Sequence, residues 1–290
     1  MLIQQENRTL VTSQGTRLQT LACARVVDAE QPVLVLQVGY DLDPGVVRKQ
    51  SPNEDTLSVT RGVISSTPPK PFTLLMVADG MGGQAHGQEA SQLAVHTLTE
   101  YVSGSLRSKQ ETSKTLLPIL KAGVQSANQV LYQHNQERST DMGTTMTATL
   151  VVETTAYVAH VGDSRFYLYR EPAGLSQITQ DHSLVAALAA AGIIKPEDIY
   201  THPRRNLIYR CLGEKSTVEV DTCAVPLAAG DILLLCSDGL WEMVRDQQIA
   251  AILTLPTPDP SQTAHALIQA ALAGGGEDNV SAIVVKMSKL

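Results

Sequence analysis

Hydrophobic residues recur along the chain in short runs that are rich in β-branched side chains. Such runs are typical of β-strands, and they predict strands at residues 33–39, 72–78, 144–153, 156–162, 166–169, 231–237 and 280–287. In other stretches the apolar residues repeat with the period of an α-helix. This second pattern predicts helices at residues 87–102, 113–134, 183–191, 244–253 and 261–273.

The connections between the predicted strands indicate how the sheets are built. Only "TT" and "DSR" separate the strands within residues 144–169, and both connections are too short for a helical crossover. We therefore expect an antiparallel three-strand meander there, with helices flanking the sheets in pairs. Such a meander argues against a doubly wound parallel sheet.

Composition narrows the class of protein. The 290 residues are 43% hydrophobic, which is enough to bury the core of a globular protein. Twenty-nine acidic residues outnumber 22 scattered basic ones, and this net charge of −7 argues against nucleic acid as a partner. No apolar run has the length of a membrane span, and the first residues lack the order of a signal peptide. We therefore expect a cytoplasmic, monomeric protein that does not contact a membrane.

The cysteines exclude two kinds of chemistry. Cys23, Cys211, Cys223 and Cys236 form no C-x-x-C pair, so a zinc or dithiol redox site is not expected. None of the four is followed by arginine six positions later, so the chain has no phosphate loop of the cysteine phosphatase kind. We interpret them as buried free thiols.

The segment "VADGMGGQA" permits two interpretations. Gly80, Gly82 and Ala85 match the G-x-G-x-x-G/A spacing of dinucleotide-binding proteins. However, Asp79 would repel a pyrophosphate at that position. The alternative is that Asp79 faces a cation, with the glycines allowing backbone carbonyls to approach it. The predicted meander favours this second interpretation.

Two further aspartates resemble Asp79 in their setting. Asp79 and Asp238 each follow an apolar strand and precede glycine, and Asp278 comes just before a third such strand. An aspartate before glycine commonly only begins a turn. Carboxylates gathered at the ends of neighbouring strands, however, repel one another unless a positive charge lies between them. Their hard oxygen ligands favour Mg²⁺ or Mn²⁺.

The segment "GVVRKQSPNED" adds a possible anion-binding group. It places Arg48 shortly before Glu54 and Asp55, ahead of the strand that leads to Asp79. These charges are either solvated loop residues or part of the same site, where an arginine binds a phosphate through two hydrogen bonds. Metals, carboxylates and arginine together describe a phosphate-ester hydrolase.

In these segments the chain resembles the metal-dependent Ser/Thr protein phosphatases of the PPM or type 2C family, especially the short bacterial members. The resemblance runs from about Val38 to Val285 and rests on ordered segments: "VRKQSPNED", "VADGMGG", "DMGTTMTATL", "AHVGDSRFYLYR", "ITQDHS", "HPRRNLIYRCLG", "LLLCSDGLWEMV" and "GEDNVSAIVV". It implies an α+β fold, a sandwich of two antiparallel β-sheets flanked by paired α-helices. Residues 33–290 would form one catalytic domain with a flap at about 181–212, and residues 1–32 an extension with an edge strand.

The resemblance also implies roles for the charged residues. Asp79 would bridge two Mn²⁺ or Mg²⁺ ions, of which Asp238 and Asp278 bind the first. The Gly80 carbonyl and either Glu54 or Asp55 would bind the second, and Asp141 with Asp238 a weaker third. Arg48 would hold the phosphate while a metal-activated water attacks phosphorus. The catalytic residues of this prediction are therefore Asp79, Asp238 and Arg48.

Two features leave the details of this prediction open. Met81 stands where some members have a histidine that protonates the leaving group. The candidate proton donors are therefore a metal-bound water and His182. The alternative for His182 is a structural role in which it caps the next helix. Asp163 and Arg165 of "GDSR" are expected to support the structure. Arg204 and Arg205 of the flap either meet a phosphoprotein or are plain surface charges.

The implied function is the hydrolysis of phosphoserine and phosphothreonine in proteins, in signal transduction opposite a cognate Ser/Thr kinase. One alternative is a phosphatase with a narrow regulatory substrate. Another is a non-catalytic module of the same fold that only binds phosphoproteins. Since such a module would be expected to lose metal-binding carboxylates and all of them are present here, we favour the enzyme.

Overall fold

The computed structural model describes residues 34–82, 86–108, 113–257 and 259–289. These residues belong to one unit, Val33–Leu290. The predicted extension at residues 1–32 and its edge strand lie outside the described residues, as do Cys23 and Ala85.

The strands form two sheets, and every strand pair among the described residues is antiparallel. The first sheet has the order β1 (Leu34–Asp43), β11 (Val280–Lys289), β10 (Ile232–Cys236), β7 (Arg165–Arg170) and β8 (Gly174–Gln177). The second has the order β2 (Asp55–Ile64), β3 (Lys70–Met81), β5 (Met146–Val152), β6 (Thr155–Val161) and β9 (Asp221–Pro226), and β4 (Gly143–Thr144) pairs with the end of β3. This antiparallel order rules out the dinucleotide-binding interpretation of the glycines.

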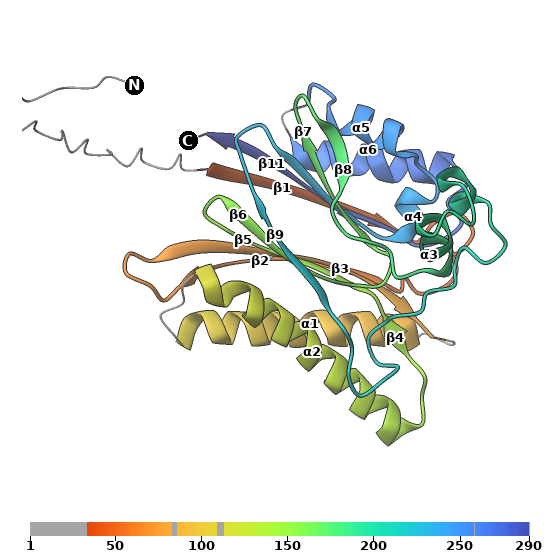
Figure 1. Cartoon of the computed structure of the whole chain (residues 1–290), viewed down its shortest axis with the longest axis horizontal. Coiled ribbons are helices and arrows are strands. Elements are labelled where there is room, and N and C mark those ends of the chain that lie inside the picture. Colours follow the sequence, from red (N-terminus) through yellow and green to blue (C-terminus); the bar gives the residue numbers. More distant parts are fainter. Residues whose placement is uncertain (1–33, 83–85, 109–112, 258, 290) are drawn as a thin grey trace, which may run out of the picture. The chain divides into compact units, whose positions relative to one another are not determined.

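Helices cover the outer face of each sheet (Figure 1). The long helices α1 (His86–Ser108) and α2 (Ser113–Arg138) pack on the second sheet. On the first sheet lie α5 (Asp246–Leu253), α6 (Pro260–Ala273) and the short α4 (Asp238–Trp241). The predicted α+β sandwich with paired helices outside is therefore confirmed.

The apolar sequence of the central strands follows from this layering. Side chains alternate between the faces of a strand, so in β3 Leu74 and Met76 pack against the helices while Leu75 and Val77 pack between the sheets. Strand β10 does the same, with Leu235 turned toward the other sheet. A strand covered on both faces has no exposed position at which a polar residue is favoured, and it reads as a continuous apolar run.

One expectation about the sheets was wrong. The strands predicted within 144–169 are antiparallel, but they do not form one meander. Strands β5 and β6 pair in the second sheet, whereas β7 crosses to the first sheet and pairs with β10. The tight "DSR" turn therefore connects the two layers, because a turn of this length allows either a hairpin or a change of sheet. Strands β2, β8 and β9 had not been predicted.

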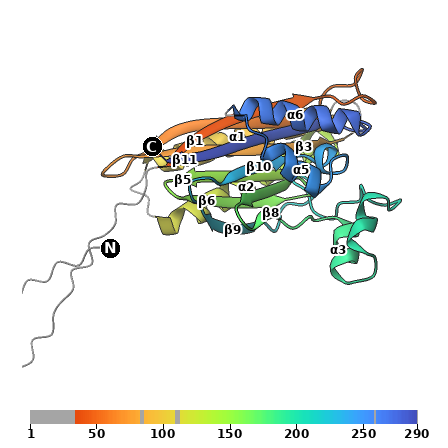
Figure 2. The same cartoon turned by 90° about the horizontal axis from the view of Figure 1, so that it is seen from above.

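The predicted flap contains α3 (Leu184–Ala190) and the short 3₁₀-helix η1 (Pro196–Tyr200). Figure 2 shows α3 at one end of the domain, beyond the edges of the sheets. Ser183 caps α3, since its side chain accepts a hydrogen bond from the Ala186 amide. Within the described ranges, no helix combines the length and the apolar character needed to cross a membrane.

Candidate metal centre

The predicted aspartates meet at one end of the two sheets. In the pairing of β2 with β3, Asp55 lies directly opposite Asp79. Asp238 begins α4 immediately after β10, and Asp278 lies two residues before β11, the neighbour of β10. The sandwich thus brings together residues separated by more than 200 positions in the sequence.

The glycine after each strand-end aspartate is required by close packing. A Cβ on Gly80 would collide with the backbone carbonyl of Gly87 in α1, and a Cβ on Gly239 would collide with that of Asn279. These contacts exclude any side chain larger than hydrogen unless the backbone moves. They fix the backbone just behind Asp79 and Asp238.

Threonine and serine hydroxyls hold two of the aspartates. The Asp79 amide donates to Thr145 Oγ1 at 2.8 Å, and the Asp79 carbonyl accepts from Thr144 Oγ1 at 2.8 Å. Asp55 Oδ2 accepts hydrogen bonds from Ser237 Oγ at 2.6 Å and Ser281 Oγ at 2.7 Å. The threonines fix the backbone of Asp79 and the serines orient the carboxylate of Asp55 before any ligand arrives.

The carboxylates strongly perturb one another. Burial, then the neighbouring Asp238 and Asp55 carboxylates, raise the pKa of Asp79 well above its usual value. Burial and the nearby Asp163 and Asp278 carboxylates do the same to the pKa of Asp238. Burial raises the pKa of Asp55 to about 6, against the opposing effect of its serine partners. Such a group of like charges calls for a cation.

Unpartnered oxygen atoms support the same conclusion. Asp55 Oδ1 and Asp238 Oδ1 are buried, and neither has a hydrogen-bond partner among the described residues. A buried carboxylate oxygen without a partner is costly unless a ligand completes its environment. All the acidic donors are hard oxygens, so the residues present fit Mn²⁺ or Mg²⁺.

The acidic side chains of the predicted site do not converge on one metal position. Within the described part of the chain, no group of three or more Asp, Glu, His or Cys side chains is already positioned to hold a metal ion. Instead, the Arg48 guanidinium lies between two of the predicted ligands and donates to Glu54 Oε2 and Asp278 Oδ1. Although partial burial opposes its charged form, these hydrogen bonds raise the pKa of Arg48 above its usual value. Arg48 therefore contacts two of the predicted ligands as a permanent cation.

Glu54 is held from its backbone as well. Its amide donates to Asn279 Oδ1 at 2.8 Å, and Asn279 Nδ2 in turn donates to the Pro44 carbonyl at 3.0 Å. Asn279 is itself buried. It thereby joins the segment that carries Arg48 and Glu54 to the start of β11.

Asp141 differs from the other predicted ligands in its surroundings. It is exposed and lines a cavity beside Met81. Met81 pairs with Gly143 in the short β3–β4 ladder, which brings the Asp141 segment close to Gly80.

His182 has a structural position. Its Nδ1 accepts a hydrogen bond from the Gly162 amide at 3.0 Å, and its Nε2 lies 3.2 Å from Asp221 Oδ2. Burial lowers the pKa of His182, so the ring is neutral near pH 7. The expectation that it caps the next helix was wrong, because Ser183 takes that role.

Sequence analysis missed several contributors to the site. Asp163 is buried with its pKa raised to about 7 by burial and Asp181, and it lies near enough to raise the pKa of Asp79 and Asp238. Ser237 and Ser281, which bind Asp55, were also missed. The signal for Ser237 was its place directly before Asp238, whereas the role of Ser281 depends on the pairing of β10 with β11.

Arg165 of the same "GDSR" turn supports the structure, as expected. It forms a buried ion pair with Asp181 at 2.7 Å and stacks on the Trp241 ring at 3.6 Å. Trp241 Nε1 donates to the Asp163 carbonyl at 3.0 Å. These contacts connect the turn, the start of the flap and α4.

Comparison with known proteins shows which family the chain is similar to. The family model described as Protein phosphatase 2C matches residues 44–271. The serine/threonine phosphatase stp of Listeria monocytogenes is 37% identical over 249 residues, which cover 85% of this chain and 94% of that protein. Serine/threonine protein phosphatase PstP of Mycobacterium tuberculosis is 40% identical over 253 residues, covering 87% of this chain and 45% of PstP.

Solved structures agree with these similarities. The catalytic domain of PstP in complex with two manganese ions superposes with a TM-score of 0.74 and 36% identity, covering 88% of this chain and 100% of that one. The Streptococcus agalactiae serine/threonine phosphatase superposes with a TM-score of 0.77 and 30% identity, covering 87% of this chain and 99% of that one.

Proposed function

The chain belongs to the protein phosphatase 2C family of metal-dependent Ser/Thr phosphatases, and we propose that the carboxylates at the ends of its sheets form the catalytic metal centre. The enzyme hydrolyses phosphoserine and phosphothreonine in proteins. The observation that carries the proposed site is the group of mutually repelling aspartates with two buried, unpartnered oxygens.

We assign the ligands of two Mn²⁺ or Mg²⁺ ions to this group. Asp79 would serve both ions, Asp238 and Asp278 would hold the first, and the Gly80 carbonyl with Glu54 or Asp55 would hold the second. The register that sets Asp55 opposite Asp79 supports Asp55, and the hydrogen bond from the Gly80 amide to the Glu54 carbonyl supports Glu54. Asp141 with Asp238 would hold a weaker third ion.

The chain's own residues prepare the reaction. When bound, two divalent cations at such a site lower the pKa of a water molecule and neutralise charge on the phosphoryl oxygens. The threonine and serine hydroxyls keep Asp79 and Asp55 in place, so little reorganisation is needed during the reaction. Arg48, at the mouth of the group, binds two phosphate oxygens and orients the ester for in-line attack.

The leaving alkoxide needs a proton, and neither Met81, which stands where some family members have a histidine, nor the candidate His182 supplies it. Met81 has no acidic proton. His182 uses Nδ1 to accept from the Gly162 amide and turns Nε2 toward Asp221 and Arg210. We infer that the proton comes from water in the site.

The test of this function is phosphate release from a phosphothreonine peptide, with Mn²⁺ and with an excess of chelator. We expect turnover with Mn²⁺ and none with chelator, because carboxylate sites hold these ions only modestly. Full activity in chelator would refute the metal centre. Tight peptide binding without turnover would support a phosphoprotein-binding module instead.

We further propose that the enzyme acts in signal transduction as a cytoplasmic monomer, opposite a Ser/Thr kinase whose targets it dephosphorylates. The names of the relatives support protein substrates. Light scattering tests the monomer and cell fractionation tests the location. Failure to dephosphorylate the products of any Ser/Thr kinase from the same cell would overturn the kinase relationship.

A further inference from the structure

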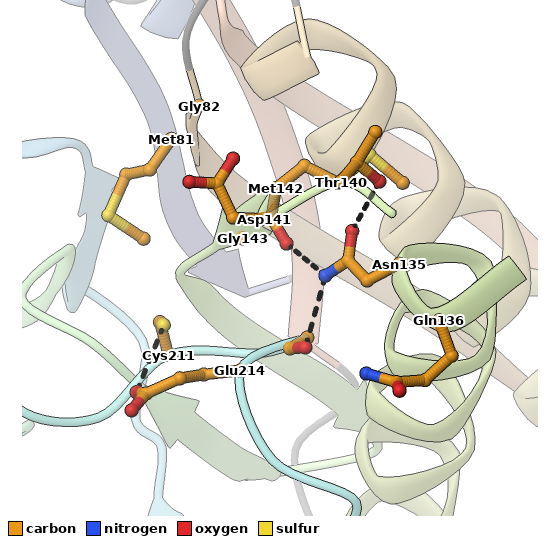
Figure 3. Close-up of a pocket in the computed structure, with 11 residues that line it drawn as sticks. Met81, Gly82, Asn135, Gln136, Thr140, Asp141, Met142, Gly143, Cys211 and Glu214 are labelled. Carbon is orange, nitrogen blue, oxygen red and sulfur yellow. Dashed lines mark hydrogen bonds between the residues drawn. The ribbon is translucent and has the colours of Figure 1, made fainter. Parts of the chain in front are cut away.

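A cavity of about 470 Å³ opens beside the proposed metal centre. This volume falls within the range of small-ligand sites. Four segments form its walls: the end of β3 with the turn after it, the end of α2, the loop that leads into β4, and the end of the flap with the residues that follow it. It is lined by Met81, Gly82, Asn135, Gln136, Thr140, Asp141, Met142, Gly143, Cys211, Gly213 and Glu214 (Figure 3).

A buried asparagine fixes these walls relative to one another. Asn135 Nδ2 donates to the Met142 carbonyl at 2.7 Å and to the Gly213 carbonyl at 3.1 Å, and its Oδ1 accepts from Thr140 Oγ1 at 2.9 Å (Figure 3). The Gly213 amide also donates to Asn128 Oδ1 at 3.0 Å. Both polar atoms of the Asn135 side chain thus join α2 to the loop that leads into β4 and to the segment around Gly213. Because these contacts lie within the protein, the cavity is formed before any ligand binds.

The cavity adjoins the reacting centre through the backbone. Met81 directly follows the Asp79–Gly80 pair, and Thr144 accepts and donates backbone hydrogen bonds with Leu212. The Thr144 side chain also binds the Asp79 carbonyl. One wall of the cavity is therefore continuous with the residues that position the metals, so a group close to the phosphorylated residue of a substrate can enter it.

The lining combines apolar walls with negative charge. Met81, Met142 and Cys211 contribute thioethers and a thiol, and burial followed by the nearby Glu214 carboxylate raises the pKa of Cys211 to about 11, so this thiol is uncharged. Asp141 and Glu214 are exposed carboxylates, drawn well apart in Figure 3. No lysine or arginine lines the cavity. Lys215, outside the lining, forms a solvent-exposed ion pair with Glu214 at 3.5 Å, and a substrate cation would compete with this weak pair.

We propose that this cavity binds a lysine or arginine side chain of the phosphoprotein, located about one to three residues from the phosphorylated residue. The aliphatic stem lies against Met81 and Cys211, and the cationic end pairs with Glu214. Long basic side chains suit such a site because their stems are apolar and only their ends are charged. This inference rests on the proposed function and adds a substrate preference to it.

The test is a set of phosphothreonine peptides that carry lysine at one position near the phosphothreonine, each matched by a peptide with uncharged norleucine there. For at least one position we expect kcat/KM to be about three to ten times higher with lysine, as a partly exposed ion pair allows. If no peptide is hydrolysed with Mn²⁺, the proposed function itself fails. If all pairs are hydrolysed at equal rates, the phosphatase stands and the cavity assignment falls.

Variants then locate the preference. Glu214→Gln should bring the lysine-to-norleucine ratio to about one, and Glu214→Lys should invert it in favour of an acidic residue at that position. Glu137→Gln is the matched control, because Glu137 is exposed on α2 next to the lining residue Gln136 but does not line the cavity. It should keep the full ratio. A lysine preference that survives both Glu214 variants, with their thermal unfolding unchanged, would overturn the proposal.

Discussion

At the scale of single residues, the chemistry depends on carboxylates that the fold holds near one another against their mutual repulsion. Asp238 shows this most clearly, because its Oδ1 is buried without a described partner while burial, followed by Asp163 and Asp278, raises its pKa. A divalent cation would satisfy the free oxygen and offset the repulsion at once. The carboxylates that are proposed to bind the metals thus destabilise the metal-free protein, and the predictions for individual residues follow from this.

Asp238→Asn keeps the shape of the side chain and removes one negative charge. An amide oxygen is a poorer ligand for a hard cation, so we expect kcat to fall by about a hundredfold or more. The metal-free variant should be at least as stable as the parent, because one source of repulsion is gone. Titration calorimetry with Mn²⁺ should show a lost or weakened site. Near-normal binding together with near-normal turnover would contradict the assignment of Asp238 to the metals.

Arg48→Ala should mainly weaken substrate binding. Its guanidinium, which contacts Glu54 and Asp278, is proposed to bind phosphate in the ground state as well as in the transition state. Steady-state kinetics should therefore show KM raised by about tenfold, with kcat changed much less. The opposite pattern, a large loss of kcat at constant KM, would require a different role for Arg48.

At the scale of elements, the sequence predicts strands well where both faces are buried, but β2, β8 and β9, three of the four strands at the ends of the two sheet orders, were missed. β3 and β10 read as apolar runs because each is covered by helices on one face and by the other sheet on the second. Strands β2 and β9 are edge strands with one neighbour each, so polar residues are tolerated and the pattern is lost. The sheet that β7 joins is fixed by long-range packing, which no local pattern records.

The residues of the proposed metal centre also divide into those that a local pattern predicts and those that only long-range packing brings into place. The grouping of Asp79 and Asp238 could be predicted because an apolar run ends just before each, and the nearness of Arg48 because it lies shortly before Glu54 and Asp55. Ser281, which lies within β11, binds Asp55 only because the two sheets bring these residues together. The sequence around Ser281 is that of an ordinary strand, so its role could not be predicted.

The flap gives an element-scale prediction. Arg205 joins it to the body of the domain, pairing with Glu242 at 3.2 Å and Glu277 at 2.7 Å, so the alternative that it is a plain surface charge is not supported. Arg205→Ala should release this attachment and increase amide hydrogen exchange in residues 196–208 by about three- to tenfold, because partly exposed ion pairs contribute about 1 kcal/mol or less. Mass spectrometry of exchange measures it. The exposed neighbour Arg204 provides the control, and equal effects of Arg204→Ala would show that Arg205 does not attach the flap.

At the scale of the whole molecule, stability is linked to the charge of the site. A carboxyl group whose pKa is raised on folding binds its proton more tightly in the folded state, so stability falls as the pH rises from the unfolded pKa through the folded pKa and then levels off. Asp55, Asp163, Asp79 and Asp238 all behave in this way. Buried His160, whose pKa is lowered to about 3, acts in the opposite sense only below about pH 6.5. Above that pH the carboxylates decide the trend.

We therefore expect the chelator-treated protein to have a lower Tm at about pH 8 than at about pH 6.5, by about 5 °C. Saturating Mn²⁺ should reduce or reverse the difference, because the metals bind the deprotonated carboxylates. Asp163→Asn should also reduce it in the metal-free protein. Calorimetric scans at the two pH values measure these changes. The same Tm at both pH values without metal would show that the carboxylates are not strained in the fold.

The most direct test of the central claim is anomalous diffraction from crystals of this protein grown with Mn²⁺. We predict two manganese peaks at the end of the sheets, with Asp79 contacting both ions, Asp238 and Asp278 contacting one, and Glu54 or Asp55 the other. Manganese bound away from Asp79, or no bound manganese under conditions in which the enzyme turns over, would contradict it.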